Sequence, residues 1–498
     1  MERKVSLIIL DGFGMRNSTY YNAVKNARTP YFDSLWKKYP HTRIKTKGEF
    51  VGLKKGQFGN SEVGHLNLGS GRIVKQNSTR IFESINSGDF FEDKKLIKLI
   101  NNLKRTNSAL HVFGLCSDGG VHAELEHLFA VLKLCKNQNF NNVLIHFISD
   151  GRDTDVHSGK KFLIKLENFI KKLGIGKVVS LTGRFYAMDR EKNYDRTEKF
   201  LNVLTKYQSE NKFDSLKDAF DYYYKNSITD EYILPTVLKS GNYFIEDKDA
   251  VLCFNFRSDR ARQIFEKLIE KNIKNLYSFI SYDSKFNDKV NVIFNEESSK
   301  NCLSEVLSKN NKTQLRISET TKYAHVTYFF NLLNETPFKG ETRIIIEGDK
   351  VPNFALKPLM KTKEITNKII EETDKNDYDF ILVNFPNADM LGHTGNYEKT
   401  IESLEFLDKN LSVLTRNLIK KGYEILITAD HGNADIMKYP DGTVCTTHTT
   451  SDAPLIYVGQ RKIKLMRGGK LASVSPTILD LFGIDPPKEF TEKSLIEK

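Results

Sequence analysis

The sequence predicts an α/β protein in which strands and helices alternate along the chain. Short apolar runs rich in β-branched residues are bounded by polar turn residues, and stretches with helical spacing follow them. This alternation is typical of an α/β fold, and no internal repeat or low-complexity segment interrupts it. Several of the apolar runs end at acidic residues or arginines, at the position where an open parallel sheet collects its ligands.

Three of the expected strands lead to an aspartate. They are residues 5–10 before Asp11, residues 380–385 before Asp389 after a short loop, and residues 424–428 before Asp430. Because ligands gather at the carboxyl ends of parallel strands, we expect these three carboxylates from distant parts of the chain to form one site. Each signal taken singly is weak, since Asp11-Gly12 alone is more often an ordinary turn.

The middle of the chain repeats this arrangement with arginines. The expected strands are residues 110–115, 143–148, 178–181 and 251–256. The loops after them contain His122, Arg152, Asp153, Arg184, Arg190, Arg257 and Arg260. A planar guanidinium grips phosphate and carboxylate with paired hydrogen bonds, so these loops predict a pocket for a substrate that carries both groups. For any one arginine, a structural ion pair is the alternative.

Two domains are expected, because 498 residues exceed the size at which a single hydrophobic core keeps growing. We assign residues 1–75 and 300–498 to a discontinuous metal-binding, phosphatase-like domain and residues 76–299 to an inserted phosphotransferase or substrate-binding domain. The crossings are expected near Gln76 and near Ser299, the second beside a polar run typical of a linker. Two crossings would form a double hinge, and domain closure would exclude water.

Composition argues against several classes of protein. The five cysteines have no close paired spacing, which argues against a disulfide framework or a cysteine zinc site and fits a reducing cytoplasm. The N-terminal apolar run is too short for a signal peptide and no membrane-length stretch follows, so we expect a soluble, cytoplasmic protein without a membrane partner. The formal net charge is +12, but the lysines are mixed with acidic residues, so no nucleic acid partner is expected.

Ser61 is the candidate nucleophile. A hydroxyl is a poor nucleophile at neutral pH, so Ser61 needs a neighbouring base or a metal that lowers its pKa. Distant segments supply carboxylate and imidazole ligands for two metals: Asp11, Asp389, His393, Asp430, His431 and His448. The alternatives are that Ser61 only caps a helix and that His393 is an ordinary helix-surface or core histidine. Their occurrence together favours the two-metal interpretation.

These motifs together resemble the cofactor-independent (2,3-bisphosphoglycerate-independent) phosphoglycerate mutases of the alkaline phosphatase superfamily. The similar stretches occur in the family order over nearly the whole chain: residues 59–72, 117–122, 150–154, 186–190, 255–262, 319–327, 390–395 and 428–434. The resemblance implies an alkaline-phosphatase-like three-layer sandwich with a second α/β substrate-binding domain inserted. It also implies a monomer.

The resemblance further implies an isomerase, an intramolecular phosphotransferase that interconverts 3-phosphoglycerate and 2-phosphoglycerate in glycolysis and gluconeogenesis. Two manganese ions would be required and 2,3-bisphosphoglycerate would not. Carried over by motif, one metal would be held by Asp389, His393 and His448, and the other by Asp11, Ser61, Asp430 and His431. Carboxylate and imidazole suit manganese, and magnesium, cobalt and zinc remain alternatives.

The implied mechanism has two halves. Ser61 attacks the phosphoryl group in line, and the glycerate left behind turns so that its other hydroxyl takes the phosphoryl group back from phospho-Ser61. Both metals and Lys322 would offset the negative charge of the transferring group. Asp153 is expected to act as the acid and base for the glycerate hydroxyls, and His122 to contact the substrate. The arginines of the middle domain would bind the substrate carboxylate and phosphate.

Three other functions stay open at this point. A phosphatase of the same superfamily would share the metals and release phosphate, although hydrolysis needs no arginine-rich pocket to hold glycerate. A phosphopentomutase would share the metals but generally uses threonine where this chain has Ser61. A non-enzymatic basic binding protein would show neither manganese dependence nor an effect of Ser61→Ala on activity.

Overall fold

The structure is a computed structural model that describes residues 3–295 and 300–497. These residues fall into two compact units, one within the ranges 1–75 and 297–498 and the other within 76–296. We call them the split unit and the continuous unit. The first change of unit occurs at Gln76, whereas the crossing expected near Ser299 lies outside the described residues.

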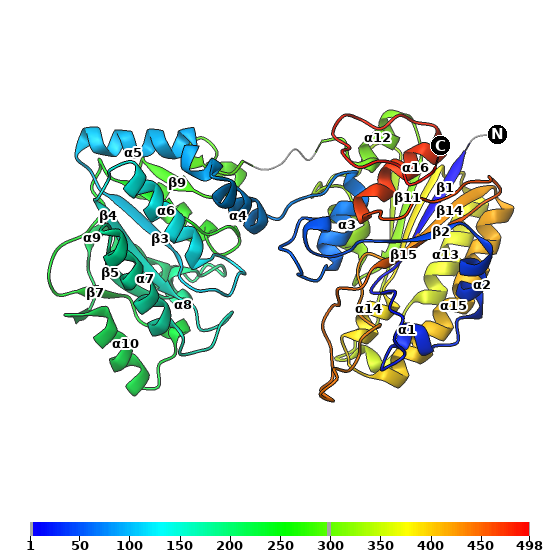
Figure 1. Cartoon of the computed structure of the whole chain (residues 1–498), viewed down its shortest axis with the longest axis horizontal. Coiled ribbons are helices and arrows are strands. Elements are labelled where there is room, and N and C mark those ends of the chain that lie inside the picture. Colours follow the sequence, from blue (N-terminus) through cyan, green and yellow to red (C-terminus); the bar gives the residue numbers. More distant parts are fainter. Residues whose placement is uncertain (1–2, 296–299, 498) are drawn as a thin grey trace. The chain divides into compact units, whose positions relative to one another are not determined.

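A seven-stranded sheet forms the centre of the split unit, in the order β12-β11-β13-β1-β14-β15-β2. Its strands are β1 (Lys4–Leu10), β2 (His41–Ile44), β11 (Gln314–Glu319), β12 (Glu341–Ile346), β13 (Phe380–Phe385), β14 (Tyr423–Thr428) and β15 (Ala453–Val458). All neighbours are parallel except that β15 is antiparallel to both β14 and β2. The dark blue β1 lies among strands of the C-terminal third (Figure 1), so distant segments share one core.

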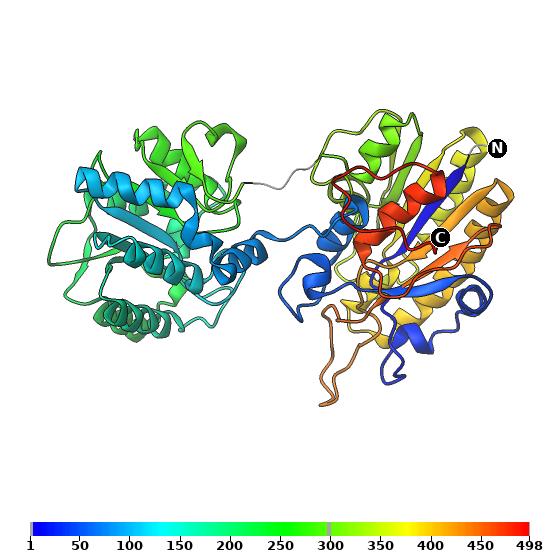
Figure 2. The same cartoon turned by 45° about the horizontal axis from the view of Figure 1, so that its top comes forward.

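Helices cover both faces of this sheet, which is the expected three-layer α/β arrangement. They are α1 (Ala23–Asn26), α2 (Pro30–Lys38), α3 (Ser61–Ser70), α12 (Leu303–Lys309), α13 (Thr362–Lys375), α14 (Asn387–Gly392), α15 (Tyr397–Lys420) and α16 (Val474–Phe482). Helix α15 packs on α13 and β14, whereas α16 packs on α3 and β1. The red α16 and the yellow and orange α13 and α15 accordingly lie on opposite sides of β1 (Figures 1 and 2).

The continuous unit has an eight-stranded sheet in the order β10-β9-β8-β3-β4-β5-β7-β6, in which only the β5–β7 pair is antiparallel. The strands are β3 (Leu110–Leu115), β4 (Val143–Ser149), β5 (Lys177–Gly183), β6 (Asn211–Phe213), β7 (Thr236–Leu238), β8 (Ala250–Cys253), β9 (Leu276–Ser278) and β10 (Val290–Val292). The helices are α4 (Asn77–Ser87), α5 (Lys94–Thr106), α6 (Leu125–Asn137), α7 (Gly159–Leu173), α8 (Arg184–Ala187), α9 (Tyr194–Lys206), α10 (Leu216–Lys225) and α11 (Arg262–Glu270).

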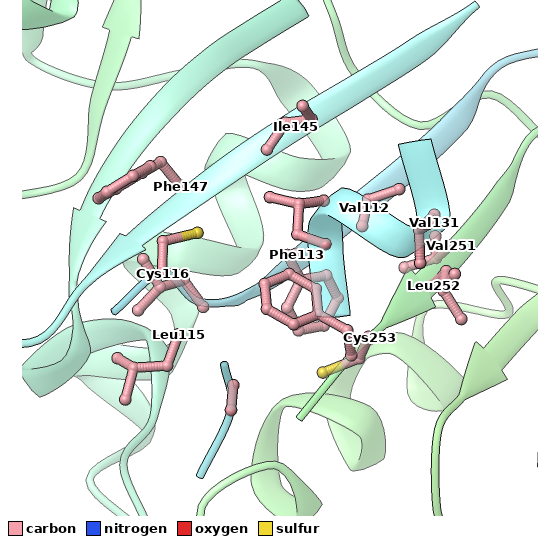
Figure 3. Packing of buried hydrophobic residues seen from close by; sticks show 14 of the residues in the cluster. Val112, Phe113, Leu115, Cys116, Val131, Ile145, Phe147, Val251, Leu252 and Cys253 are labelled. Atoms are coloured by element: carbon pink, nitrogen blue, oxygen red, sulfur yellow. The ribbon is translucent and has the colours of Figure 1, made fainter. Parts of the chain in front are cut away.

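Strand β3 lies in the middle of this second core. Figure 3 shows Val112 and Phe113 of β3 among Ile145 of β4, Val251 of β8 and Val131 of α6, and all five side chains are buried. Because apolar side chains point to both faces of β3, the strand requires helices on both faces, as parallel sheets do. The apolar run that identified this strand in the sequence is therefore a core strand.

One expected strand is shorter than its sequence suggested. Residues 251–256 were expected to form a strand, but β8 ends at Cys253. The side chain of Asn255 accepts a hydrogen bond from the backbone N–H of Leu115 at 3.0 Å, and the N–H of Phe256 donates to the carbonyl of His122 at 2.8 Å. The chain therefore leaves the sheet early and runs beside the loop that carries His122.

The helices of the described residues include none with the combination of length and apolar character needed to cross a membrane.

Candidate active site

Three aspartates meet at the carboxyl ends of adjacent strands in the split unit. Strand β1 lies between β13 and β14, so the loops after these three strands emerge side by side. The N–H of Asp389 donates to the carbonyl of Asp11 at 3.0 Å, and the side chain of Asp430 accepts from the N–H of Gly12 at 3.3 Å. All three aspartates are buried. The sheet therefore brings together the carboxylates that the strand pattern pointed to.

Gly12 allows the loops after β1 and β13 to approach this closely. Its φ of +76° lies in the left-handed region that favours glycine. A Cβ atom at this position would lie 2.6 Å from the backbone nitrogen of Asp389. The turn that was the alternative interpretation of Asp11-Gly12 is therefore present, and it also places Asp11 beside Asp389.

The three histidines predicted as metal ligands lie around these carboxylates. His431 is buried, and its Nε2 is 3.4 Å from Asp11 Oδ1. His448 Nε2 is 3.3 Å from Asp389 Oδ1, and His393 Nε2 is 3.2 Å from the same oxygen. Two sets of ligand atoms each lie within 4.8 Å of one another: Asp389 with His431 and His448, and Asp11 with Asp430 and His431.

The loop between β14 and β15 carries His448. It runs beyond the end of the sheet of the split unit, on the side where α14 lies (Figures 1 and 2). The Nε2 atoms of His448 and His393 are 3.1 Å apart, while His393 Nδ1 lies 2.7 Å from the carbonyl oxygen of Thr446. His393 is 40% exposed and directed toward Asp389 and His448, so it is not a core histidine.

Ser61 stands at the start of α3, beside this cluster. Its Oγ lies 2.9 Å from His431 Nε2, 3.2 Å from Asp11 Oδ1 and 2.5 Å from Lys322 Nζ. Ser61 does not cap the helix, because Asn60 is the N-cap and its side chain accepts from the N–H of Val63. The Ser61 hydroxyl therefore does not cap the helix, and it faces the side chains of His431, Asp11 and Lys322.

Lys322 is the buried cation of the cluster. Its Nζ donates to Asp389 Oδ2 at 2.6 Å and to Asp11 Oδ1 at 2.9 Å. Burial alone would lower the pKa of Lys322, but the surrounding carboxylates outweigh burial and raise it above its ordinary value. Lys322 in turn holds the pKa values of Asp11 and Asp389 well below their usual range, against the effect of burial. Lys322, Asp11 and Asp389 are therefore ionised at neutral pH.

The donor atoms of this cluster fit divalent metal ions. Asp430 Oδ2 is buried and has no hydrogen-bond partner among the described residues, so a lone pair is available. His431 Nδ1 lies 3.2 Å from the carbonyl oxygen of Gly432, and a neutral His431 that donates there has its Nε2 electron pair facing Ser61. The surrounding carboxylates outweigh burial and raise the pKa of His431 to about 9, so a metal would replace a proton on this ring. Carboxylate and imidazole donors with a hydroxyl suit manganese and similar divalent ions.

A second cluster lies within the continuous unit, around Arg184. This arginine is 1% exposed, and its Nη1 donates to Asp150 Oδ1 at 2.7 Å and to Asp153 Oδ2 at 2.5 Å. His122 has Nε2 at 4.0 Å from Asp153 Oδ2 and Nδ1 at 3.7 Å from Asp259 Oδ1. Burial and then the charge of Arg184 lower the pKa of His122 to about 4, so His122 is neutral at neutral pH.

The remaining predicted arginines lie around this cluster. Their contacts are Arg190 Nη1 with Asp259 Oδ2 at 2.8 Å, Arg257 Nε with Asp259 Oδ1 at 3.2 Å, Arg152 Nη1 with Glu231 Oε1 at 3.3 Å, and Arg260 Nη1 with the carbonyl of Met188 at 3.1 Å. Burial lowers the pKa of Arg260, and the positive charges of Arg184 and Arg190 lower it further. Positive charge gathered around Arg260 in this way fits an anionic ligand.

Four polar residues of the two clusters were assigned no role from the sequence. Asp150 and Asp259 pair with the predicted arginines, and His65 and Asn384 contact the groups around Ser61. Asn384 could have been recognised from the sequence, because it is the one polar residue in the apolar strand β13. Asp150, Asp259 and His65 lie in motifs in which a functional role was assigned to a neighbouring residue instead.

The fold and the clustered ligands define a metalloenzyme. A family model described as the metalloenzyme superfamily matches residues 3–486. A 2,3-bisphosphoglycerate-independent phosphoglycerate mutase from Clostridium tetani is 43% identical over 511 aligned residues, which cover 100% of this chain and 99% of the relative. The protein of the same description from Staphylococcus epidermidis is 43% identical over 506 aligned residues, again with 100% of this chain and 99% of the relative covered.

A solved structure agrees with these relatives. The crystal structure of Leishmania mexicana phosphoglycerate mutase at low cobalt concentration matches with a TM-score of 0.67 and 28% identity, covering 100% of this chain and 98% of that one. The chain belongs to the 2,3-bisphosphoglycerate-independent phosphoglycerate mutases. The resemblance that the sequence motifs suggested is confirmed.

Proposed function

We propose that this protein interconverts 3-phosphoglycerate and 2-phosphoglycerate through a phosphoserine intermediate at Ser61, without 2,3-bisphosphoglycerate. The observation that carries the proposal is the environment of the Ser61 hydroxyl, which contacts His431, Lys322 and Asp11 in a buried cluster. A serine in such surroundings is suited to nucleophilic attack on a phosphoryl group. The family to which the chain belongs supplies the substrate class.

Two divalent metal ions, preferably Mn²⁺, are part of the proposal. One would be held by Asp389, His393 and His448, and the other by Asp11, Ser61, Asp430 and His431. When bound, the metals would stabilise the alkoxide of Ser61 and offset phosphoryl charge. His431 belongs to both groups of close ligand atoms, so its assignment to the second metal is itself part of the proposal.

Lys322 would bind the transferring phosphoryl group. Its ammonium group is buried and touches the Ser61 hydroxyl, so it lies where negative charge would develop during the transfer. The raised pKa of Lys322 keeps it charged at neutral pH. It would therefore act as a fixed cation and not as a base.

The continuous unit would hold the substrate. Arg152, Arg184, Arg190, Arg257 and Arg260 would bind its carboxylate and phosphate, and neutral His122 would contact it. Asp153, held by Arg184, would take and return the protons of the glycerate hydroxyls. An arginine cluster that binds glycerate favours a mutase over a phosphatase, because hydrolysis does not need to retain glycerate.

The proposal is tested by phosphorus NMR of the protein with 3-phosphoglycerate and Mn²⁺, in the absence of 2,3-bisphosphoglycerate. We expect 2-phosphoglycerate to appear with the wild-type protein and not with Ser61→Ala. Ser70→Ala is the matched control, since Ser70 is a buried serine at the other end of α3 whose hydroxyl donates to the carbonyls of Asn67 and Arg72 and accepts from the N–H of Arg72. Inorganic phosphate as the product would indicate a phosphatase instead.

We also propose that the protein acts as a cytoplasmic monomer with small-molecule substrates and no nucleic acid partner. The even mixture of lysines with acidic residues supports the absence of a nucleic acid partner. Light scattering of the purified chain tests the oligomeric state, and a mass of twice the 57.2 kDa of the chain would contradict the monomer.

A further inference from the structure

Asn384 lies behind the carboxylates of the split unit, at the carboxyl end of β13, and is fully buried. Its Nδ2 donates to Asp11 Oδ2 at 2.7 Å and lies 3.0 Å from His65 Nε2. An ionised carboxylate only accepts hydrogen bonds, so the amide nitrogen of Asn384, and not its oxygen, must face Asp11. The second N–H of the same amide group then points at His65.

His65 continues this chain of hydrogen bonds toward the nucleophile. It is fully buried on α3, one turn after Ser61, and its Nδ1 lies 2.8 Å from the carbonyl oxygen of Ser61. A carbonyl oxygen only accepts, so Nδ1 carries the proton, and Nε2 of the neutral ring is left as the acceptor for Asn384. The donors and acceptors at both ends of His65 therefore agree on one tautomer.

We infer that Asn384 and His65 are positioning residues that fix the carboxylate of Asp11 and the backbone of Ser61 relative to each other. The bond from Asn384 occupies Asp11 Oδ2, so Asp11 Oδ1 is the oxygen that faces the Ser61 hydroxyl and Lys322. The bond from His65 fixes the first turn of α3, on which the Ser61 hydroxyl is carried. The inference rests on the proposed function, in which Asp11 and Ser61 share a metal.

His65 is thereby excluded from two other roles that its position suggests. It is buried beside a candidate metal site, and its Nδ1 is only 3.2 Å from Asp430 Oδ2. Yet both ring nitrogens are used, one as a donor to Ser61 and one as an acceptor from Asn384. His65 has no free electron pair for a metal or for the proton of a substrate.

The first test measures Mn²⁺ binding to the Asn384→Ala variant by electron paramagnetic resonance, together with kcat and KM. Loss of a residue that orients a metal ligand typically weakens metal affinity or activity by about 10- to 100-fold. We expect a loss of this size at one of two Mn²⁺ sites and in kcat, with a smaller change in KM. Wild-type affinity at both sites in the folded variant would overturn the inference.

Asn22→Ala is the matched control for the loss of a buried asparagine. Asn22 is also fully buried, and its Nδ2 also donates twice, to the carbonyls of Arg16 and Ser18. This variant should lose stability, but it removes no contact of Asp11 or Ser61, so we expect its Mn²⁺ affinity to stay at the wild-type value. An equal loss of affinity in both variants would show a general effect of destabilisation and would overturn the positioning role.

A second measurement on the wild-type protein needs no variant of Asn384. Nitrogen NMR of ¹⁵N-histidine-labelled protein, with His65 assigned by its loss in His65→Asn, should show the Nδ1–H tautomer. The Nε2–H tautomer would overturn the inference even if Asn384→Ala failed to fold. His65→Asn should also keep more activity than His65→Ala, because an asparagine amide can still donate to the Ser61 carbonyl.

Failure of the proposed function would look different. If the wild-type protein bound fewer than two Mn²⁺ ions, the metal-binding part of the proposed function would be contradicted. The tautomer of His65 would then still decide between the positioning role and its absence.

Discussion

Replacing Arg184 with methionine tests how the arginine cluster of the continuous unit is held together. Arg184 is 1% exposed, and its partners Asp150 and Asp153 have side chains 2% and 17% exposed. Removing one partner of a buried ion pair leaves an uncompensated charge and costs about 3–5 kcal/mol. Because Asp153 keeps some contact with water, we expect the lower end, about 3 kcal/mol. With a urea m-value of about 2–3 kcal/mol/M, the unfolding midpoint should fall by about 1 M.

The assay is urea unfolding followed by circular dichroism and by tryptophan fluorescence. The chain has one tryptophan, Trp36, which lies in α2 of the split unit. We expect Arg184→Met to lower the midpoint seen by circular dichroism while the fluorescence midpoint stays unchanged. This difference would locate the loss of stability in the continuous unit.

Arg190→Met is the matched control for this prediction. It removes the same type of side chain from the same unit, but the ion pair of Arg190 with Asp259 has side chains 44% and 30% exposed. An exposed pair contributes at most about 1 kcal/mol, so the shift should be less than half of that for Arg184→Met. Equal shifts for the two variants, or a fluorescence midpoint that moves as far as the circular dichroism midpoint, would refute the reasoning.

Three further predictions concern pH, backbone geometry and metal. Burial raises the pKa of Asp230 to about 6, so the folded state binds more protons than the unfolded state between pH 3.8 and about 6. The stability of the folded state should therefore fall as pH rises through this window, and the melting temperature of Asp230→Asn should fall less over the same range. An equal fall in melting temperature for the wild type and the variant would contradict this prediction. Gly12→Ala should weaken Mn²⁺ binding, because the new Cβ atom would collide with Asp389. Gly442→Ala is the control: its φ is also positive, at +89°, but no atom lies within 4 Å of the position of its Cβ, so it should lower stability without changing Mn²⁺ affinity. Titration of both variants with Mn²⁺ distinguishes these effects. Dialysis against a chelator should lower both activity and the melting temperature, and added divalent metal should restore both; retention of full activity would contradict a metal requirement.

The sequence predicted the cluster of three aspartates because of one rule about sheets. Asp11 and Asp430 directly follow apolar strands, and Asp389 follows one after a short loop, so the carboxyl ends of parallel strands place all three at one edge. The α/β class was predicted from the alternation of strand-like and helical stretches, whereas the three layers and the family were implied by motifs that resemble the family and occur in its order along the chain. Most of the fold could therefore be predicted from local sequence patterns.

The sequence did not predict individual side-chain pairs between remote residues. The pair of Asp150 with Arg184 joins residues 34 positions apart, and the bond of Asn384 to Asp11 joins residues 373 positions apart. Neither can be recognised from spacing alone. The expected strand at 251–256 was wrong at its end because the side chain of Asn255 replaces a backbone partner at Leu115, which no propensity describes.

The central claim is that Ser61 carries the phosphoryl group between the two hydroxyls of glycerate. The most direct measurement is mass spectrometry of peptides from the protein, mixed with 3-phosphoglycerate and Mn²⁺ and quenched in acid during turnover. We predict one added phosphoryl group on the peptide that contains Ser61, located on Ser61 itself by fragmentation. Formation of 2-phosphoglycerate with no phosphoryl group on Ser61, or with the group on another residue, would contradict the account.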